Sequence, residues 1–179
     1  MKLLTQIFHK PNLHLKAKTV TREAVRAIIL NGDLVLMVHS RINGDYKFPG
    51  GGVEEGEQHS ATLQRELLEE CGAKLKTVLG EFGRVEEYDK AKEEEFELFC
   101  MHSYYYFCEI EDGLGKQNLD DYESEYGFFP EWVTLAHAIE VNRKLMENPP
   151  PNIQRWVQRE LFVLEMLATL NEGGSSKEL

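Results

Sequence analysis

Residues 51–73 read GGVEEGEQHSATLQRELLEECGA. This stretch opens on glycines and then turns helical, because Leu63, Leu67 and Cys71 recur every four residues and form one apolar stripe. Gly72 follows at once and favours a helix end, since glycine readily adopts the left-handed conformation that closes many helices. The sequence therefore predicts a glycine-rich loop leading into a helix over 58–71 that packs on a core by its apolar side.

Three glutamates of this predicted helix share one face. Glu66, Glu69 and Glu70 are spaced i, i+3 and i+4, and like charges at that spacing repel by about 0.2–0.5 kcal/mol per pair. A divalent cation would offset the repulsion, and carboxylate oxygens without His or Cys select Mg²⁺, Mn²⁺ or Ca²⁺ over Zn²⁺. The alternative is a solvated acidic helix face. The preceding glycine loop and Arg65, four residues before Glu69, favour the metal site.

The segments around this helix predict a mixed sheet with helices packed on its faces. Strands are expected where β-branched and aromatic residues gather, over 22–30, 34–38, 46–48, 75–85 and 96–110. Asn31-Gly32-Asp33 is a strong hairpin signal between the first two of them. Later helices are expected over 134–147, with Thr134 as the N-cap, and from about 153 to 170, with three prolines between them. An acidic loop is expected over 111–125.

The length of the chain fits one compact domain. It has 179 residues, 42% of them hydrophobic and 28% charged, which are globular proportions. We divide it into an irregular N-terminal arm over 1–20, a single α/β domain over 21–170 and a flexible tail over 171–179. No internal repeat suggests a second domain.

The charge balance narrows the classes of partner. The formal net charge is −11, which argues against binding of duplex nucleic acid, because phosphate neutralisation needs a basic face. Binding of a small nucleotide is compatible with this negative charge, since metal ions bridge carboxylates to phosphates. Cys71, Cys100 and Cys108 are odd in number and widely spaced, as expected of reduced thiols in the cytoplasm. No signal peptide or membrane span is expected, and the oligomeric state is left open between monomer and homodimer.

The polar positions of the 51–73 stretch resemble the Nudix box. The matching pattern is Gly51, Glu57, Arg65-Glu66-Leu67, Glu69-Glu70 and Gly72, and the one departure is Ala73, where a larger aliphatic residue is usual. The resemblance implies an α/β/α sandwich with a mixed sheet. It also implies a hydrolase that cleaves the pyrophosphate linkage of a nucleoside diphosphate derivative or a nucleoside triphosphate with the help of Mg²⁺ or Mn²⁺.

The same resemblance implies roles for individual residues. Glu66, Glu69 and Glu70 resemble the metal-binding carboxylates, and the backbone carbonyl of Gly50 resembles a further metal ligand. Arg65 and Glu57 resemble the pair that orients these carboxylates during catalysis, although Glu57 alone would also suit a helix N-terminus. Glu66 or Glu70 is expected to act as the catalytic base, and an acid outside the box is the alternative.

Outside the box the expectations rest on looser likeness. An additional metal-binding acid is expected before Trp132, and we favour Glu125 over Glu123. Tyr88 and Tyr105 are assigned to substrate binding, with core packing as the alternative for the run Tyr104 to Phe107, whose alternate members face opposite sides of a strand. A nucleotide-binding sensor or regulator that keeps the fold without turnover is the competing function, and the intact glutamate set favours an enzyme.

Overall fold

The structure of the chain is a computed structural model that describes residues 1–151 and 153–174. Its larger sheet has the strand order β1 (Leu3–Phe8), β6 (Leu75–Lys90), β7 (Leu98–Ile110) and β2 (Thr19–Ile28). The two long central strands are antiparallel, whereas β1 runs parallel to β6 and β2 runs parallel to β7. The sheet is therefore mixed, as the sequence predicts.

A second sheet is organised around β4 (Leu34–Ser40). Its antiparallel partners are β3 (Leu30–Asn31), β5 (Tyr46–Lys47) and β8 (Phe128–Thr134). The turn between β3 and β4 contains Gly32 at a φ of 58°, a left-handed conformation that glycine adopts without strain. This confirms the predicted hairpin.

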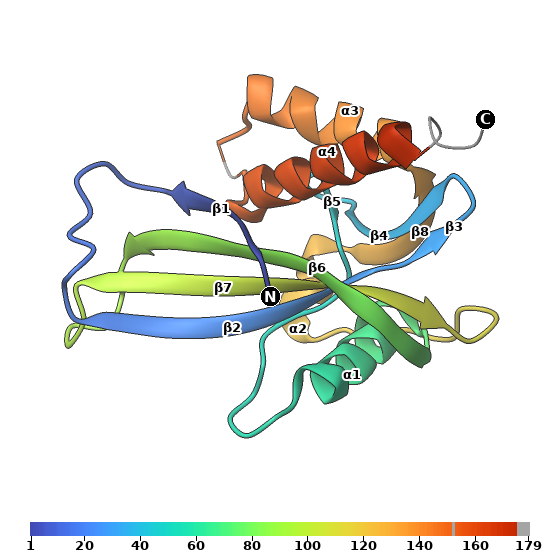
Figure 1. The fold of residues 1–179 in the computed structure, drawn as a ribbon, viewed down its shortest axis with the longest axis horizontal. Coiled ribbons are helices and arrows are strands. Elements are labelled where there is room, and N and C mark those ends of the chain that lie inside the picture. The colour runs from blue at the N-terminus through green and yellow to red at the C-terminus, as the bar shows by residue number, and fades with distance from the viewer. Residues whose placement is uncertain (152, 175–179) are drawn as a thin grey trace.

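Helices cover both sides of the sheets (Figure 1). On one side lies α1 (His59–Cys71), and on the other α3 (Leu135–Glu147) and α4 (Trp156–Gly174) pack against each other. A short helix, α2 (Asp121–Tyr126), precedes β8. The expected α/β/α sandwich is confirmed. None of the helices in the described ranges is long and apolar enough to cross a membrane.

The central strand β4 connects two hydrophobic cores. Val35 and Met37 belong to the core under α3 and α4, whereas Leu36 and Val38 belong to the core under α1. Successive side chains of a strand point to opposite faces, so one strand serves both layers. Each of these four side chains is fully buried, and burial of such a side chain contributes about 1.5–3 kcal/mol. The helix α1 is thereby held rigidly against the sheet.

The predicted helix ends are confirmed. Gly72 follows α1 at a φ of 63°. The backbone N–H of Gly72 donates to the carbonyl of Leu68, and that of the next residue donates to the carbonyl of Leu67. Thr134 caps α3, since its hydroxyl accepts a hydrogen bond of 3.2 Å from the backbone N–H of His137. Both signals are local in sequence, which explains why they could be read without the fold.

Three expectations need correction. The arm over 1–20 contains β1, which pairs with a strand more than seventy residues away and so leaves no local signal. The segment expected as an acidic loop contains α2, which begins at a capping box formed by Asp120 and Glu123. The sequence signals no strand over 128–134, yet β8 forms there despite Pro130, because β8 lies at the edge of its sheet, where proline is tolerated. The last helix extends to Gly174, and the remainder of the expected tail, 175–179, lies outside the described residues.

Candidate active site

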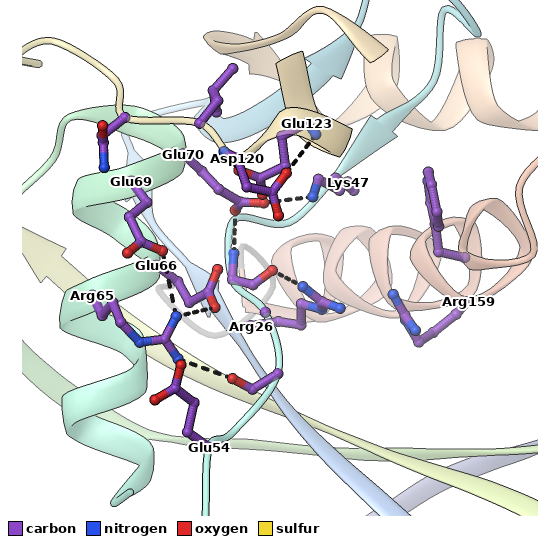
Figure 2. Close-up of a pocket in the computed structure, with 16 residues that line it drawn as sticks. Arg26, Lys47, Glu54, Arg65, Glu66, Glu69, Glu70, Asp120, Glu123 and Arg159 are labelled. Atoms are coloured by element: carbon purple, nitrogen blue, oxygen red, sulfur yellow. Dashed lines mark hydrogen bonds and ion pairs between the residues drawn. The ribbon is translucent and has the colours of Figure 1, made fainter. Parts of the chain in front are cut away.

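A cavity of about 590 Å³ lies where α1, α2, α4 and the loop after β5 meet (Figure 2). The loop runs alongside β2 and is joined to it by backbone hydrogen bonds. The backbone N–H of Val25 donates to Gly51 at 3.0 Å, and that of Ala27 donates to Pro49 at 2.8 Å. These bonds bring the glycines of the loop against the acidic face of α1.

Carboxylates from two helices converge at one end of the cavity. Glu66 and Glu70 project from α1 and are buried, with exposed fractions of 8% and 0%. Glu123 projects toward them from α2. One carboxylate oxygen of each residue lies within 4.8 Å of the others. Glu69 also lines the cavity but is more exposed.

The fully buried Glu70 is satisfied by two donors. The Lys47 Nζ donates to its Oε1 at 2.5 Å, and the backbone N–H of Gly50 donates to its Oε2 at 2.6 Å. A buried carboxylate without such partners would be strongly destabilising. Lys47 and the loop therefore hold Glu70 in one orientation at the bottom of the cavity.

Two glycines of the loop are required by close approach. Gly50 has a φ of 136°, and a Cβ there would clash with the backbone carbonyl of Val25. A Cβ on Gly51 would overlap the carboxyl group of Glu66. In contrast, a Cβ on Gly52 would meet no atom within 4 Å. The glycine run is thus needed at its first two positions, where the backbone passes next to β2 and α1.

Arg65 connects the acids along the open side of α1. Its guanidinium donates to both oxygens of Glu57, at 3.1 and 2.8 Å, and to Glu66 at 2.7 Å. Further bonds reach Glu69 at 3.4 Å and the carbonyl of Gly52 at 3.1 Å. Paired in-plane bonds of this kind fix both partners in orientation. The structure therefore brings Arg65 and Glu57 together with the acids that they were expected to orient.

The cavity is closed on its other side by α4. Arg159 is buried and donates to Glu87 at 2.5 Å and to Glu160 at 2.6 Å. Glu160 in turn accepts a hydrogen bond of 3.2 Å from the backbone N–H of Phe48, just before the glycine loop. A buried ion-pair network thus joins the last helix to the loop that carries Gly50.

The crowding of acids changes their protonation. Burial, and next the charge of Glu70, raises the pKa of Glu123 to about 7. Burial and then Glu70 also raise the pKa of Glu66. Glu57 differs, because its hydrogen bonds to Arg65 lower its pKa to about 2. The acid end of the cavity therefore concentrates more negative charge than its own cations neutralise.

The donor set fits a hard divalent cation. Glu66, Glu70 and Glu123 offer only carboxylate oxygens, within a few ångströms of one another and at the bottom of a cavity. Mg²⁺ and Mn²⁺ prefer such oxygen ligands, whereas zinc sites usually contain His or Cys. The residues present are thus suited to hold Mg²⁺ or Mn²⁺.

Four of the expected site residues have unexpected surroundings. The carbonyl of Gly50 accepts a hydrogen bond from Arg26, which leaves its second acceptor position free. Glu125 is exposed and does not line the cavity, because residues two apart on a helix point in different directions and α2 turns Glu123 inward. Tyr105 is completely buried, with its hydroxyl 3.4 Å from Glu160. Tyr88 stacks on Phe8 on the β1 side of the sheet.

Neither tyrosine is therefore brought to this cavity, and the expectations for Glu125, Tyr88 and Tyr105 do not match the observed arrangement. Sequence reasoning also missed three basic residues that line it, Lys47, Arg26 and Arg159. Lys47 gives no local signal. Arg26 does, because it is the single charge in the apolar run from Ala24 to Ile29.

Comparisons with known proteins agree on the family. A family model described as NUDIX domain matches residues 20–157. Among solved structures, a NUDIX hydrolase from Nitrosomonas europaea is 18% identical with a TM-score of 0.52, covering 84% of this chain and 90% of that chain. A MutT protein from Bacillus halodurans is 22% identical with a TM-score of 0.50, covering 67% of this chain and 72% of that chain. At this identity the two structures show a shared fold.

Curated relatives match a shorter part of the chain. An RNA pyrophosphohydrolase of Sulfurovum sp. (strain NBC37-1) is 36% identical over 77 residues, which is 40% of this chain and 49% of that protein. An RNA pyrophosphohydrolase of Helicobacter pylori (strain G27) is 34% identical over 92 residues, 48% of this chain and 56% of that protein. The chain thus spans about half the length of the curated relatives it matches.

Proposed function

The chain belongs to the Nudix family, and we propose that it is a hydrolase that uses Mg²⁺ or Mn²⁺ to cleave the pyrophosphate linkage of a nucleoside diphosphate derivative or a nucleoside triphosphate. The observation that carries this proposal is the convergence of Glu66, Glu70 and Glu123 within 4.8 Å at one end of a cavity. Family membership supports it, and so do the names of the curated relatives.

The proposed division of labour follows from the contacts. Glu66, Glu69 and Glu70 would hold the cation, with the carbonyl of Gly50 and with Glu123 in place of the expected Glu125. When bound, the cation neutralises charge on the pyrophosphate and lowers the pKa of a water molecule. Because hydrolysis of an anhydride depends mainly on positioning and on charge, the protein's own task is to keep these acids rigid.

Rigidity comes from the residues around the acids. Arg65 aligns Glu66 and Glu69 while Glu57 fixes Arg65, and Lys47 fixes Glu70. Proton removal from the attacking water is assigned to Glu66 or Glu70, with Glu123 as the acid outside the box that could replace them. Burial and then the charge of Glu70 raise the pKa of Glu123 to about 7, and a carboxyl group with a pKa near the working pH suits proton transfer.

The test is a hydrolysis screen with product analysis. Nucleoside triphosphates, nucleoside diphosphate sugars and an RNA with a 5′-triphosphate are incubated with Mg²⁺, and products are separated by chromatography. Cleavage of the pyrophosphate linkage yields a nucleoside monophosphate or a monophosphate end. Glu66→Gln should lose most turnover, and Glu55→Gln, which changes an exposed acid of the loop before α1, should keep it. Tight nucleotide binding with no turnover on any substrate would instead support a sensor or regulator.

A cytoplasmic location and a small nucleotide substrate complete the proposal. Cys71, Cys100 and Cys108 are buried free thiols, which suits a reducing compartment. The net charge of −11 disfavours a long polyanion and favours a ligand whose phosphates enter the cavity with a cation.

A further inference from the structure

Arg26 is a charged residue in a buried part of the sheet. Its neighbours on β2 from Ala24 to Ile28 are buried apolar residues, whereas its own side chain reaches the cavity. Its guanidinium donates to the carbonyl of Gly50, whose own N–H donates to Glu70 (Figure 2). Removing an arginine charge from water is costly unless an anion or several acceptors compensate it. The structure should therefore contain a partner for this charge.

The other cations lining the cavity, within the described ranges, each have a carboxylate partner. The pairs are Lys47–Glu70 at 2.5 Å, Arg65–Glu66 at 2.7 Å and Arg159–Glu87 at 2.5 Å. For Arg26, no carboxylate of the described residues lies within 4.0 Å; it donates to the neutral carbonyl of Gly50, and its Nε is buried without a hydrogen-bond partner. Arg26 thus forms no ion pair within 4.0 Å, and Glu66 interacts with its charge only from a greater distance.

Placement of the loop does not account for this arginine. Backbone hydrogen bonds already attach the loop to β2, from Val25 to Gly51, from Ala27 to Pro49 and from Val53 to Glu23, at 2.8–3.0 Å. The N–H of Gly50 is also held, by Glu70. The positive charge of Arg26 is therefore free to serve a ligand.

We propose that Arg26 binds a substrate phosphate next to the one held at the carboxylate end of the cavity. This inference rests on the proposed function, and it adds the residue that holds the second phosphate of the linkage. Guanidinium suits this task, since its planar fork matches two phosphate oxygens and stays charged at all physiological pH values. The phosphate then supplies the anionic partner that the guanidinium lacks within 4.0 Å.

The test measures binding, so that it does not depend on turnover. Isothermal titration calorimetry gives the affinity of a nucleoside diphosphate with a methylene group in place of the bridging oxygen, in the presence of Mn²⁺, and the affinity of Mn²⁺ alone. Arg26→Gln should weaken binding of the analogue by about tenfold to a hundredfold, the usual effect of losing a charged hydrogen bond. Mn²⁺ alone should bind Arg26→Gln as well as wild type or more tightly, because a nearby positive charge is gone.

Two further variants serve as controls. Arg22→Gln removes the same charge from an exposed position on the same strand and should change the affinity for the analogue less than twofold. Arg26→Lys keeps the charge without the fork and should give an intermediate affinity, and it replaces Arg26→Gln if that variant fails to fold.

Several outcomes overturn the inference. Equal weakening by Arg22→Gln and Arg26→Gln would mean that only the overall charge matters. Parallel loss of Mn²⁺ binding would make Arg26 a support for Gly50, and wild type that does not bind the analogue would remove the subsite. A failure of the proposed function would give a different result. Wild type would then bind the analogue in an Arg26-dependent way but would hydrolyse no nucleotide.

Discussion

Replacing Glu123 by Gln should stabilise the metal-free protein at pH 8. The pKa of Glu123 is raised from 4.5 to about 7 by burial and by Glu70, so the folded protein holds this proton more tightly than the unfolded chain does. Wild type therefore loses stability as the pH rises from about 4.5 to 7, and the whole loss is present above pH 7. Gln is neutral at every pH and avoids this loss. It also keeps the acceptor that the capping box at Asp120 needs.

The size of the effect follows from the pKa. A rise from 4.5 to about 7 corresponds to a ceiling of about 3.4 kcal/mol, since each pKa unit is worth about 1.36 kcal/mol. Glu123 is partly exposed, and solvent screening reduces the expected gain to about 1–2 kcal/mol. For a domain of this length, that corresponds to an increase in Tm of about 2–8 °C.

Thermal denaturation with a chelator at pH 8 and pH 5 measures the difference. Glu123→Gln should exceed wild type at pH 8, and the advantage should shrink at pH 5, where the folded wild type is already protonated. Glu125→Gln is the matched control, because that residue is exposed on the same helix, and it should change neither value. Millimolar Mg²⁺ should stabilise wild type more than Glu123→Gln. If Glu123→Gln is no more stable than Glu125→Gln at pH 8, the crowding of Glu123 and Glu70 is not real.

Three more predictions concern the loop, the cation and acid stability. Gly51→Ala should abolish most turnover, because its Cβ displaces the carboxyl of Glu66, whereas Gly52→Ala, which meets no neighbour, should stay within about twofold of wild type in a steady-state assay. Glu69→Gln should keep the Tm of the metal-free protein but lose most of the increase that Mg²⁺ produces; an increase equal to that of wild type would mean that the cation binds elsewhere. Burial would raise the pKa of Glu87, but its arginine and histidine partners lower it to about 2, so its contribution to stability is complete above about pH 4.5 and is lost as the pH falls toward 2. Unfolding followed by circular dichroism along an acid titration should therefore be less steep for Glu87→Gln, and identical curves would argue against this.

Features carried by neighbouring residues could be read from the sequence. The acidic face of α1 follows from the spacing of Glu66, Glu69 and Glu70, and the helix end at Gly72 follows from one residue. The resemblance to the Nudix box additionally predicts the α/β/α layers, which no local pattern indicates. Arg65 and Glu57 are also close in sequence, and their contact in the structure agrees with the pairing that the pattern implies.

Features that depend on distant segments could not be read in this way. Choosing between Glu123 and Glu125 requires the orientation of α2 against α1, and no periodicity in so short a helix reveals it. Strand alternation separates Tyr105 from its neighbours but does not say which face of β7 is the core, so the sequence alone does not reveal that this tyrosine is fully buried. The roles of the box residues stay predictions until turnover is measured.

The contact between Glu160 and the backbone of Phe48 has a consequence for biosynthesis. The box residues leave the ribosome well before α4 does, yet the cavity lacks its last wall, and the glycine loop its anchor, until residues 156–160 have also left the ribosome. A nascent chain that has already exposed its cluster of acids is therefore unable to position them against a closed cavity. Hydrolysis should begin only after the last helix docks, so a ribosome stalled before residue 156 would display a catalytically silent domain.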